Sequence, residues 1–342
     1  MLRTIIGIPG VLAIAVAGPS GGEGAFITAP VSNINLWCNR LAKSGSATMV
    51  MLAQELSNPN GFHAMAGPEG RFSNCDDFPL LGVPRPAKCT NYNYTHDAEV
   101  FVSQRIRPRR GQRALVCGHG LFLRPISASA LPWVFFNVAR DPVTQYRSRY
   151  NYIRVGGRFS VLLDAEAERR GECGCPAALS FEDCVVKGMA MAGRCGPEKS
   201  PLWAGNFLVS MLCNASDPAA GCQEQWYKLT QQQHIEHSAG VVRGGFAFIG
   251  LLEHMQQTLE MLEYLFPECF SGATACGVSR HNAAAIDVPL PVGARQAIEG
   301  WPANRMDVAV CREIERLFWA SVNATDAARA VSAGHVCHPC GP

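Results

Sequence analysis

The chain has 342 residues, enough for one large domain or two modest ones, and 48% of them are hydrophobic and 17% charged. This composition indicates a globular protein and excludes a disordered one. The formal net charge of +2 argues against a protein that coats nucleic acid, so a polyanionic partner would need a local basic groove.

The N-terminus has the pattern of a secretory signal. Arg3 precedes an apolar run over residues 5–18, which is shorter than the roughly 20 residues of a membrane span. Ala15-Val16-Ala17 is a suitable small-residue cleavage site. We expect residues 1–17 to form a signal peptide or a short signal-anchor, with a buried core segment as the alternative. We expect the Gly-, Pro- and Ser-rich residues 18–33 to form a flexible stem.

A strand, a short loop and a helix follow the stem. Ile34 to Cys38 alternates as a strand does, and Met49 to Leu56 has helical composition. Between them lie Lys43 and a run of small and hydroxyl residues. Free N–H groups at a helix start, together with a lysine, suit a phosphate or sulfate. The lysine precedes the glycine, so the loop does not match the Walker A spacing of nucleotide kinases. An ordinary turn with Ser44 or Ser46 as the helix cap is the alternative.

Strands and helices alternate in the rest of the chain. Residues 58–93 are rich in Pro, Gly, Asn and Asp and are expected to be irregular. Apolar runs predict buried strands at residues 114–117, 133–139 and 245–250. Pro142 begins a predicted helix that runs to about residue 152, and an amphipathic helix is predicted over residues 251–266. This alternation predicts an α/β fold with a parallel sheet.

Fifteen cysteines are consistent with an oxidising compartment. Two close pairs flank loops that contain Gly, Pro or Asn, as local disulfides do: Cys184 with Cys195, and Cys213 with Cys222. Because the count is odd, at least one thiol is free or pairs between chains.

The C-terminal tail, residues 331–342, contains four potential metal ligands: His335, Cys337, His338 and Cys340. A terminal Cys-x-x-Cys with no second pair nearby is a poor structural zinc site. We therefore predict no metal.

Three features occur in this chain: Lys43 in a strand-to-helix loop, His119 after a strand, and Arg140-Asp-Pro with Ser148 eight residues later. Together they resemble the uronyl 2-O-sulfotransferase family, which contains the heparan sulfate and chondroitin/dermatan uronyl enzymes. Asn39-Arg-Leu-Ala-Lys-Ser-Gly-Ser46 is similar to the family's N-R-V-P-K-T-x-S loop. Val138-Ala-Arg-Asp-Pro-Val-Thr-Gln-Tyr-Arg-Ser148 is similar to its V-x-R-D-P-[IV]-x(5)-S segment. His119 follows a predicted strand, and the paired cysteines occur in the family's order. The resemblance spans roughly residues 34–285.

The resemblance implies a P-loop-like three-layer α/β/α sulfotransferase domain, which we place at residues 34–330. It implies 3′-phosphoadenosine 5′-phosphosulfate (PAPS) as the sulfate donor. His119 would be the general base, and Lys43 would stabilise the leaving phosphate. Arg140 and Ser148 would hold the 3′-phosphate, and Arg40 would bind an acidic group of the acceptor. The backbone amides of the loop would bind the donor as well, from residues Ser44, Gly45, Ser46, Ala47 and Thr48.

The resemblance also implies an acceptor and a compartment. The acceptor would be an anionic polysaccharide, with O-2 of a uronic acid as the expected position of sulfation. The compartment would be the Golgi lumen, with an N-terminal membrane anchor if the signal is not cleaved. Three positions depart from the family: Ala42 replaces a proline, Ala47 a threonine, and Cys117 a histidine that contacts substrate. A secreted glycan-binding protein that has lost turnover is therefore the alternative, and a nucleotide kinase is a third reading that the loop spacing disfavours.

Overall fold

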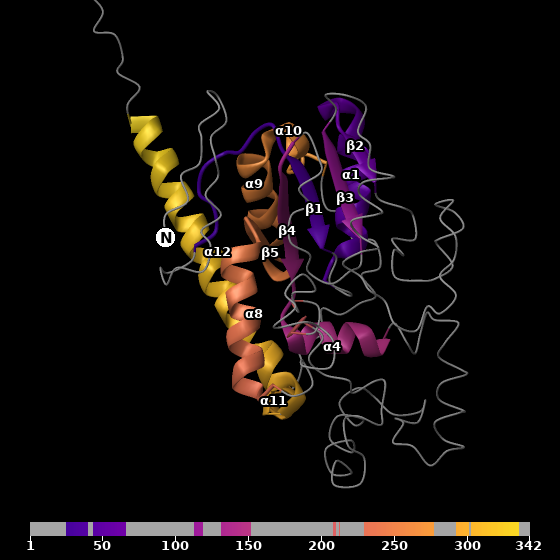
Figure 1. The fold of residues 1–342 in the computed structure, drawn as a ribbon, viewed down its shortest axis with the longest axis vertical. Helices are drawn as coiled ribbons and strands as arrows, with labels where there is room; N and C mark the ends of the chain where they lie inside the picture. The colour runs from indigo at the N-terminus through magenta and orange to yellow at the C-terminus, as the bar shows by residue number, and fades with distance from the viewer. Residues whose placement is uncertain are drawn as a thin grey trace, which may run out of the picture.

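The computed structural model describes residues 25–39, 44–65, 113–118, 131–151, 208–209, 212, 229–276, 292–300 and 302–334. Within them the sheet has five strands in the order β2-β3-β1-β4-β5 (Figure 1). The strands are β1 (Asn35–Asn39), β2 (His63–Met65), β3 (Ala114–Gly118), β4 (Trp133–Ala139) and β5 (Phe248–Leu251). Every strand pairing is parallel. The predicted α/β class and parallel sheet are confirmed.

Strand β4 is buried along its whole length. All seven of its residues are buried, as its continuous apolar run predicted for a strand covered on both faces. Phe136 packs edge-on against Phe270, with ring centroids 5.4 Å apart, while its neighbour Phe135 packs against Phe246. Because consecutive side chains of a strand point to opposite faces, helices or loops must cover the sheet on both sides.

The helices that follow the first strands lie near their predicted positions. Helix α1 (Ser46–Asn60) extends the predicted helix at both ends, and α4 (Pro142–Asn151) begins at the predicted proline. The amphipathic segment after β5 divides into a 3₁₀ turn, η4 (Leu252–His254), and α9 (Met255–Leu265). The short α10 (Pro267–Phe270) then packs against α1.

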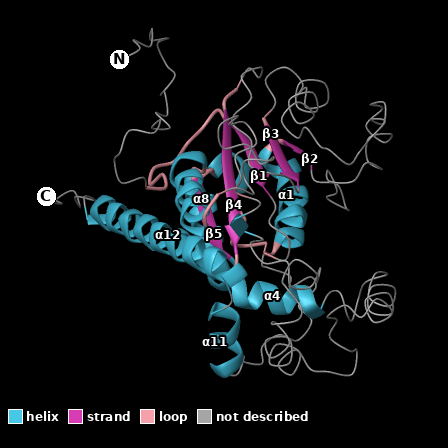
Figure 2. Cartoon of the chain, turned by 60° about the horizontal axis from the view of Figure 1, so that its bottom comes forward, coloured by secondary structure: helices cyan, strands magenta, loops and turns pink. Residues whose placement is uncertain are grey.

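Besides the short α10, three longer helices of the described residues were not predicted: α8 (Gln231–Gly245), α11 (Val292–Gly300) and α12 (Pro302–Gly334). Helices α8 and α12 pack against each other beside β5 (Figure 2). No helix in the described ranges is both long and apolar enough to cross a membrane.

Two predictions about irregular segments need correction. Strand β2 lies within the stretch expected to be irregular, and it is held there by pairing with β3, where His63 donates its backbone N–H to the carbonyl of Arg113 at 2.8 Å. Residues 25–33 differ from the flexible stem that was expected. Phe26 is only 3% exposed, and the backbone N–H of Val31 donates to the carbonyl of Leu265 at 2.8 Å. This part of the stem is fastened to the folded domain, with Phe26 in its core.

Candidate active site

The carboxyl ends of the parallel strands meet at one edge of the sheet, and the arrowheads of β1 and β4 point there, toward α4 (Figure 1). After β1 the chain continues to β2, at one edge of the sheet, and after β4 it continues to β5, at the opposite edge. Connections that leave neighbouring strands in opposite directions open a crevice, which is the usual ligand site of parallel α/β sheets. The candidate site is therefore the edge where β1 and β4 end.

The predicted site residues follow strands that end at this edge. Residues 40–48 follow β1, His119 follows β3, and Arg140 follows β4. Asn39 and Gly118 are register partners, so the chain leaves β1 and β3 at adjacent points. The structure describes Ser44, Gly45, Ser46, Ala47, Thr48, Arg140 and Ser148. Arg40, Lys43 and His119 lie outside the described residues, as do the four cysteines that were expected to pair, Cys184, Cys195, Cys213 and Cys222.

The N-terminus of α1 has no side-chain cap. Its N-cap is Gly45, in the left-handed conformation with φ 73° and ψ 13°, so neither serine of the loop is the cap. The first turn of the helix contains no acidic residue. The first N–H groups of a helix need a partner and favour negative charge, so this end of α1 suits a phosphate or sulfate group.

A buried contact joins this loop to α4. Gln145 Nε2 donates a hydrogen bond to Ser44 Oγ at 3.3 Å. Ser44 is 1% exposed and Gln145 7%, so the contact is shielded from water. The loop after β1 and the helix after β4 are thereby fixed relative to each other.

Three polar residues follow one another at intervals of four from the start of α4. Arg140 Nε donates to Thr144 Oγ1 at 3.0 Å, which directs the arginine side chain along the first turn of the helix. Ser148 lies four residues beyond Thr144 and is 9% exposed. Thr144 and Ser148 are four apart within α4 and so lie on one face of the helix. Arg140, which precedes the helix, is joined to this face by its hydrogen bond to Thr144.

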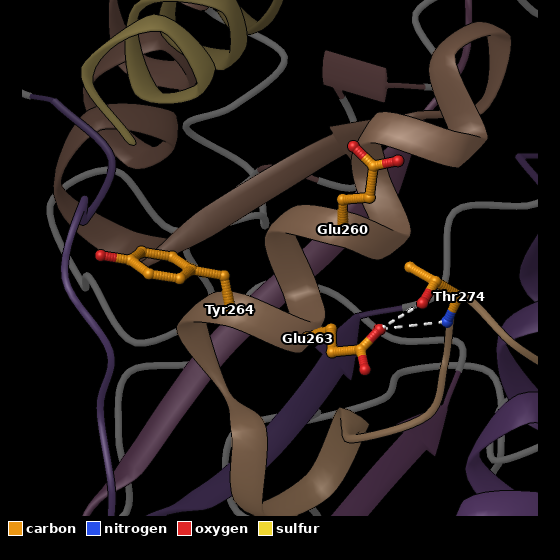
Figure 3. A pocket seen from close by; sticks show the side chains of 4 residues that line it. All are labelled: Glu260, Glu263, Tyr264 and Thr274. Carbon is orange, nitrogen blue, oxygen red and sulfur yellow. Dashed lines mark hydrogen bonds between the residues drawn. The ribbon is translucent and has the colours of Figure 1, made fainter. Parts of the chain in front are cut away.

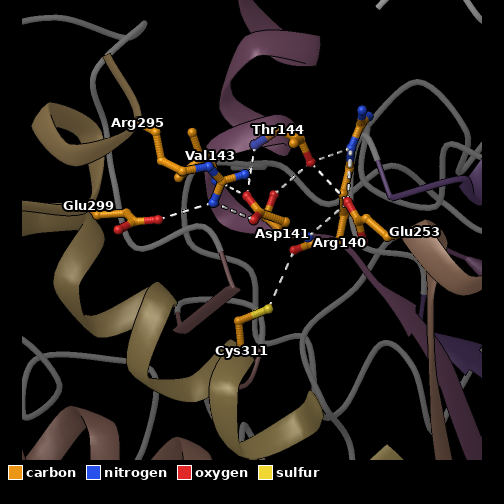
Figure 4. A network of polar contacts seen from close by, with 8 residues as sticks. All are labelled: Arg140, Asp141, Val143, Thr144, Glu253, Arg295, Glu299 and Cys311. Carbon is orange, nitrogen blue, oxygen red and sulfur yellow. Dashed lines mark hydrogen bonds and ion pairs between the residues drawn. The ribbon is translucent and has the colours of Figure 1, made fainter. Parts of the chain in front are cut away.

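Arg140 lies among carboxylates at the start of α4 (Figure 4). Burial lowers the pKa of its guanidinium below the usual value, and the nearby Glu253 and Asp141 partly offset this effect. An arginine remains charged in proteins despite such a shift. Arg140 is thus a permanent cation at the edge of the sheet.

Asp141 caps α4 with one oxygen and binds an arginine with the other. Its Oδ1 accepts hydrogen bonds from the backbone N–H groups of Val143 at 2.7 Å and Thr144 at 3.0 Å. Its Oδ2 accepts from Arg295 Nη1 of helix α11 at 2.9 Å (Figure 4). The same Nη1 donates to Glu299 Oε1 at 3.0 Å. The start of α4 is therefore held by its own cap and by α11.

Comparison with characterised proteins finds distant relatives. The chain is 21% identical over 238 residues to heparan sulfate 2-O-sulfotransferase 1 of Xenopus laevis and of Homo sapiens. It is 23% identical over 237 residues to the heparin sulfate O-sulfotransferase of Drosophila melanogaster. The chain is related to the uronyl 2-O-sulfotransferases.

The similarity covers only part of each protein. The alignments cover 69% of this chain and 56% of the vertebrate proteins, so the chain spans about half the length of the curated relatives it matches. No family model matches the chain.

Two residues near the candidate site, Thr144 and Glu253, were not predicted from the sequence. Thr144 binds Arg140, and its spacing of four from both Arg140 and Ser148 was a signal that could have identified it. Glu253 approaches Arg140 from the end of the neighbouring strand β5, with its Oε1 3.8 Å from Arg140 Nε. The amphipathic pattern of its segment gave no indication of this contact.

A buried cysteine lies behind the arginine but has no catalytic character. Cys311 Sγ is 3.7 Å from the carbonyl oxygen of Arg140. Burial, with smaller contributions from nearby carboxylates, raises the pKa of the Cys311 thiol well above its usual value. The thiolate is the reactive form of cysteine, so this residue is not a nucleophile here.

A pocket of about 240 Å³ lies away from the carboxyl edge, in the second half of α9 (Figure 3). It is lined by Glu260, Glu263, Tyr264 and Thr274. Glu263 accepts hydrogen bonds from Thr274 Oγ1 at 2.6 Å and from the backbone N–H of Gly272 at 2.8 Å. Two carboxylates make this pocket unsuitable for an anionic donor, and Glu263 serves to fasten the turn after α10. Among the described residues, no group of three or more His, Cys, Asp and Glu side chains could hold a metal.

Proposed function

We propose that this chain transfers a sulfonate group from PAPS to a hydroxyl of an anionic polysaccharide, with O-2 of a uronic acid as the preferred position. The observation that carries the proposal is the hydrogen bond from Arg140, just before α4, to Thr144 on the same helix face as Ser148. Gln145 of this helix binds Ser44, directly before the uncapped start of α1. Two separate anion-binding places, one at each helix, suit a donor with phosphate groups at both 5′ and 3′.

The fold we infer is the P-loop-like three-layer α/β/α fold of sulfotransferases. The five-stranded parallel sheet and its order support it. The 2-O-sulfotransferase relatives support it as well.

The donor would be held at both ends. The first N–H groups of α1, together with Lys43, would bind the 5′-phosphosulfate. Arg140 would bind the 3′-phosphate through its forked donors, and Ser148 would donate its hydroxyl. Because lysine, arginine and helix amides can neutralise the donor, the mechanism requires no metal.

The transfer is an in-line substitution at sulfur. The acceptor oxygen forms a bond to sulfur while the bond from sulfur to the phosphate oxygen breaks. His119 takes the proton of the acceptor hydroxyl, and Lys43 stabilises the charge that grows on the departing phosphate. Gly118 and Asn39 are register partners at the ends of β3 and β1. His119 follows Gly118, and the loop that would bind the donor follows Asn39. This proximity supports the pairing of base and donor.

The acceptor side of the site differs from that of the relatives. Arg40 would bind a carboxylate or sulfate of the polysaccharide. Cys117 is fully buried in β3, so its side chain does not replace the substrate contact of the histidine that the family resemblance places there. We infer an acceptor specificity different from that of heparan sulfate enzymes, in the Golgi lumen where such polymers are modified.

The test is calorimetric binding of adenosine 3′,5′-bisphosphate (PAP), the desulfated donor, against ADP to the full chain. PAP should bind at least tenfold more tightly, because only PAP has a 3′-phosphate. A panel of uronic-acid polymers with PAPS then identifies the acceptor. Equal binding of the two nucleotides contradicts the proposal. Failure of a folded sample to bind PAP would favour the alternative, a secreted glycan-binding protein that has lost turnover. The departures from the family at Ala42, Ala47 and Cys117 are consistent with that alternative.

A further inference from the structure

Glu253 reaches the start of α4 from the neighbouring strand. It lies in η4, directly after β5, and Leu251 at the end of β5 is the register partner of Ala139 at the end of β4. Glu253 and Arg140 therefore leave adjacent strands at the same edge of the sheet.

One carboxylate oxygen of Glu253 faces three donors (Figure 4). Its Oε1 lies 2.9 Å from Thr144 Oγ1, 3.2 Å from the backbone nitrogen of Asp141 and 3.8 Å from Arg140 Nε. A hydroxyl, a backbone amide and a guanidinium are the groups that bind an oxygen of a phosphate. Glu253 thus occupies a place that a phosphate oxygen could take.

The contact with the arginine is a loose one. Arg140 Nε makes its hydrogen bond to Thr144 at 3.0 Å, and its separation of 3.8 Å from Glu253 Oε1 is an ion pair without a hydrogen bond. The side chain of Glu253 is 36% exposed and that of Arg140 only 14%. Glu253 can turn into solvent without opening the core, whereas Arg140 stays in place.

We propose that Glu253 is a specificity-determining residue of the donor site, whose carboxylate occupies the 3′-phosphate position at Arg140 until the donor displaces it. This inference rests on the proposed function. A carboxylate and a phosphate dianion repel each other at this distance, so a bound 3′-phosphate requires Glu253 to withdraw. Its return as PAP leaves favours release of the product.

The decisive variant is Glu253→Gln, which keeps the size of the side chain and removes its charge. PAP should bind about tenfold more tightly, a change of about 1.4 kcal/mol, and dissociate more slowly. Binding of AMP, which lacks the 3′-phosphate, should change less than twofold. The effect on PAP should disappear when Arg140→Ala is also present, because a double-mutant cycle isolates the pair.

The matched control is Glu299→Gln. Glu299 belongs to the same group of charges but binds Arg295, on α11. Its neutralisation should change PAP binding less than twofold, which separates a local contact from the general charge of the surface. Melting temperatures of both variants should show that they are folded.

Each outcome is informative. If the unmodified chain does not bind PAP, the proposed function fails before this inference is tested. If it binds PAP but Glu253→Gln does not bind PAP more tightly, Glu253 does not compete with the phosphate. Weaker binding would mean instead that Glu253 positions Arg140. A similar gain for AMP and PAP would show that the effect is not specific to the 3′-phosphate, and would overturn the inference.

Discussion

Gln145 Nε2 donates a hydrogen bond to Ser44 Oγ at 3.3 Å, and this contact joins α4 to the loop after β1 across 101 positions of sequence. We expect Gln145→Met, which keeps the length of the side chain, to lower the free energy of unfolding by about 1 kcal/mol, the typical net value of such a hydrogen bond. PAP affinity should fall as well, because the two helix starts would no longer be fixed relative to each other. Denaturant unfolding and calorimetry measure the two effects.

The control for this variant is Gln256→Met. Gln256 donates to Glu260 Oε1 at 2.9 Å, in an exposed pair one turn apart within α9. The exposed pair should contribute less than about 0.5 kcal/mol. Equal losses in the two variants would mean that the contact between Gln145 and Ser44 does not stabilise the protein.

Some elements were predictable because their signal is local. β4 is a continuous apolar run followed by Arg-Asp-Pro, and α4 begins at its proline. α8 carries a capping box at Thr230 and Gln233, which the sequence contains as Thr-x-x-Gln. Val310, Ile314, Leu317 and Phe318 of α12 are buried at helical spacing. These two helices could therefore have been predicted, and were overlooked.

Other features have no local signal. β2 is three residues long, too short to show an alternating pattern, and it exists through its pairing with β3. The positions of Glu253 and Arg295 beside Arg140 and Asp141 depend on how η4 and α11 pack onto the start of α4. Such contacts join residues 100 or more positions apart, which a single sequence does not reveal.

Arg140 should determine the preference for a 3′-phosphate. We expect Arg140→Ala to weaken PAP binding roughly 10- to 100-fold, since hydrogen bonds to a charged group contribute about 1.5–3 kcal/mol. AMP binding should change less than threefold. Arg243→Ala is the control. Arg243 of α8 pairs with Glu313 of α12 at 3.0 Å, away from the carboxyl ends of the strands. Equal loss of PAP and AMP binding in Arg140→Ala would remove the assignment to the 3′-phosphate.

His119 should act in the chemical step and not in donor binding. We expect His119→Ala to lose roughly 10²-fold in turnover, the scale of a general base, while PAP affinity stays within twofold. His63, an exposed histidine at the first position of β2, gives a matched control. His63→Ala should keep full turnover in the same sulfate-transfer assay. Turnover that survives in His119→Ala would exclude this histidine as the base.

Gly45, at the end of the loop that follows β1, has a backbone conformation that requires glycine. Its φ of 73° is one that an L-residue adopts at a penalty, and a Cβ added there would lie 2.6 Å from Leu252 Cδ1. Gly61 at the other end of α1 has a similar φ of 65° but nothing within 4 Å of an added Cβ. We expect Gly61→Ala to destabilise the protein by about 1 kcal/mol, from backbone strain alone.

Gly45→Ala should destabilise it by about 2 kcal/mol, because the side chain of Leu252 must also move. Since Leu252 precedes Glu253, that movement should disturb the donor site and weaken PAP binding, which Gly61→Ala should leave unchanged. Thermal unfolding and calorimetry on the two variants separate the shared strain from the contact. If both variants lose the same free energy of unfolding, Leu252 moves aside without penalty. Close packing between η4 and the start of α1 would then not be the reason for glycine at position 45.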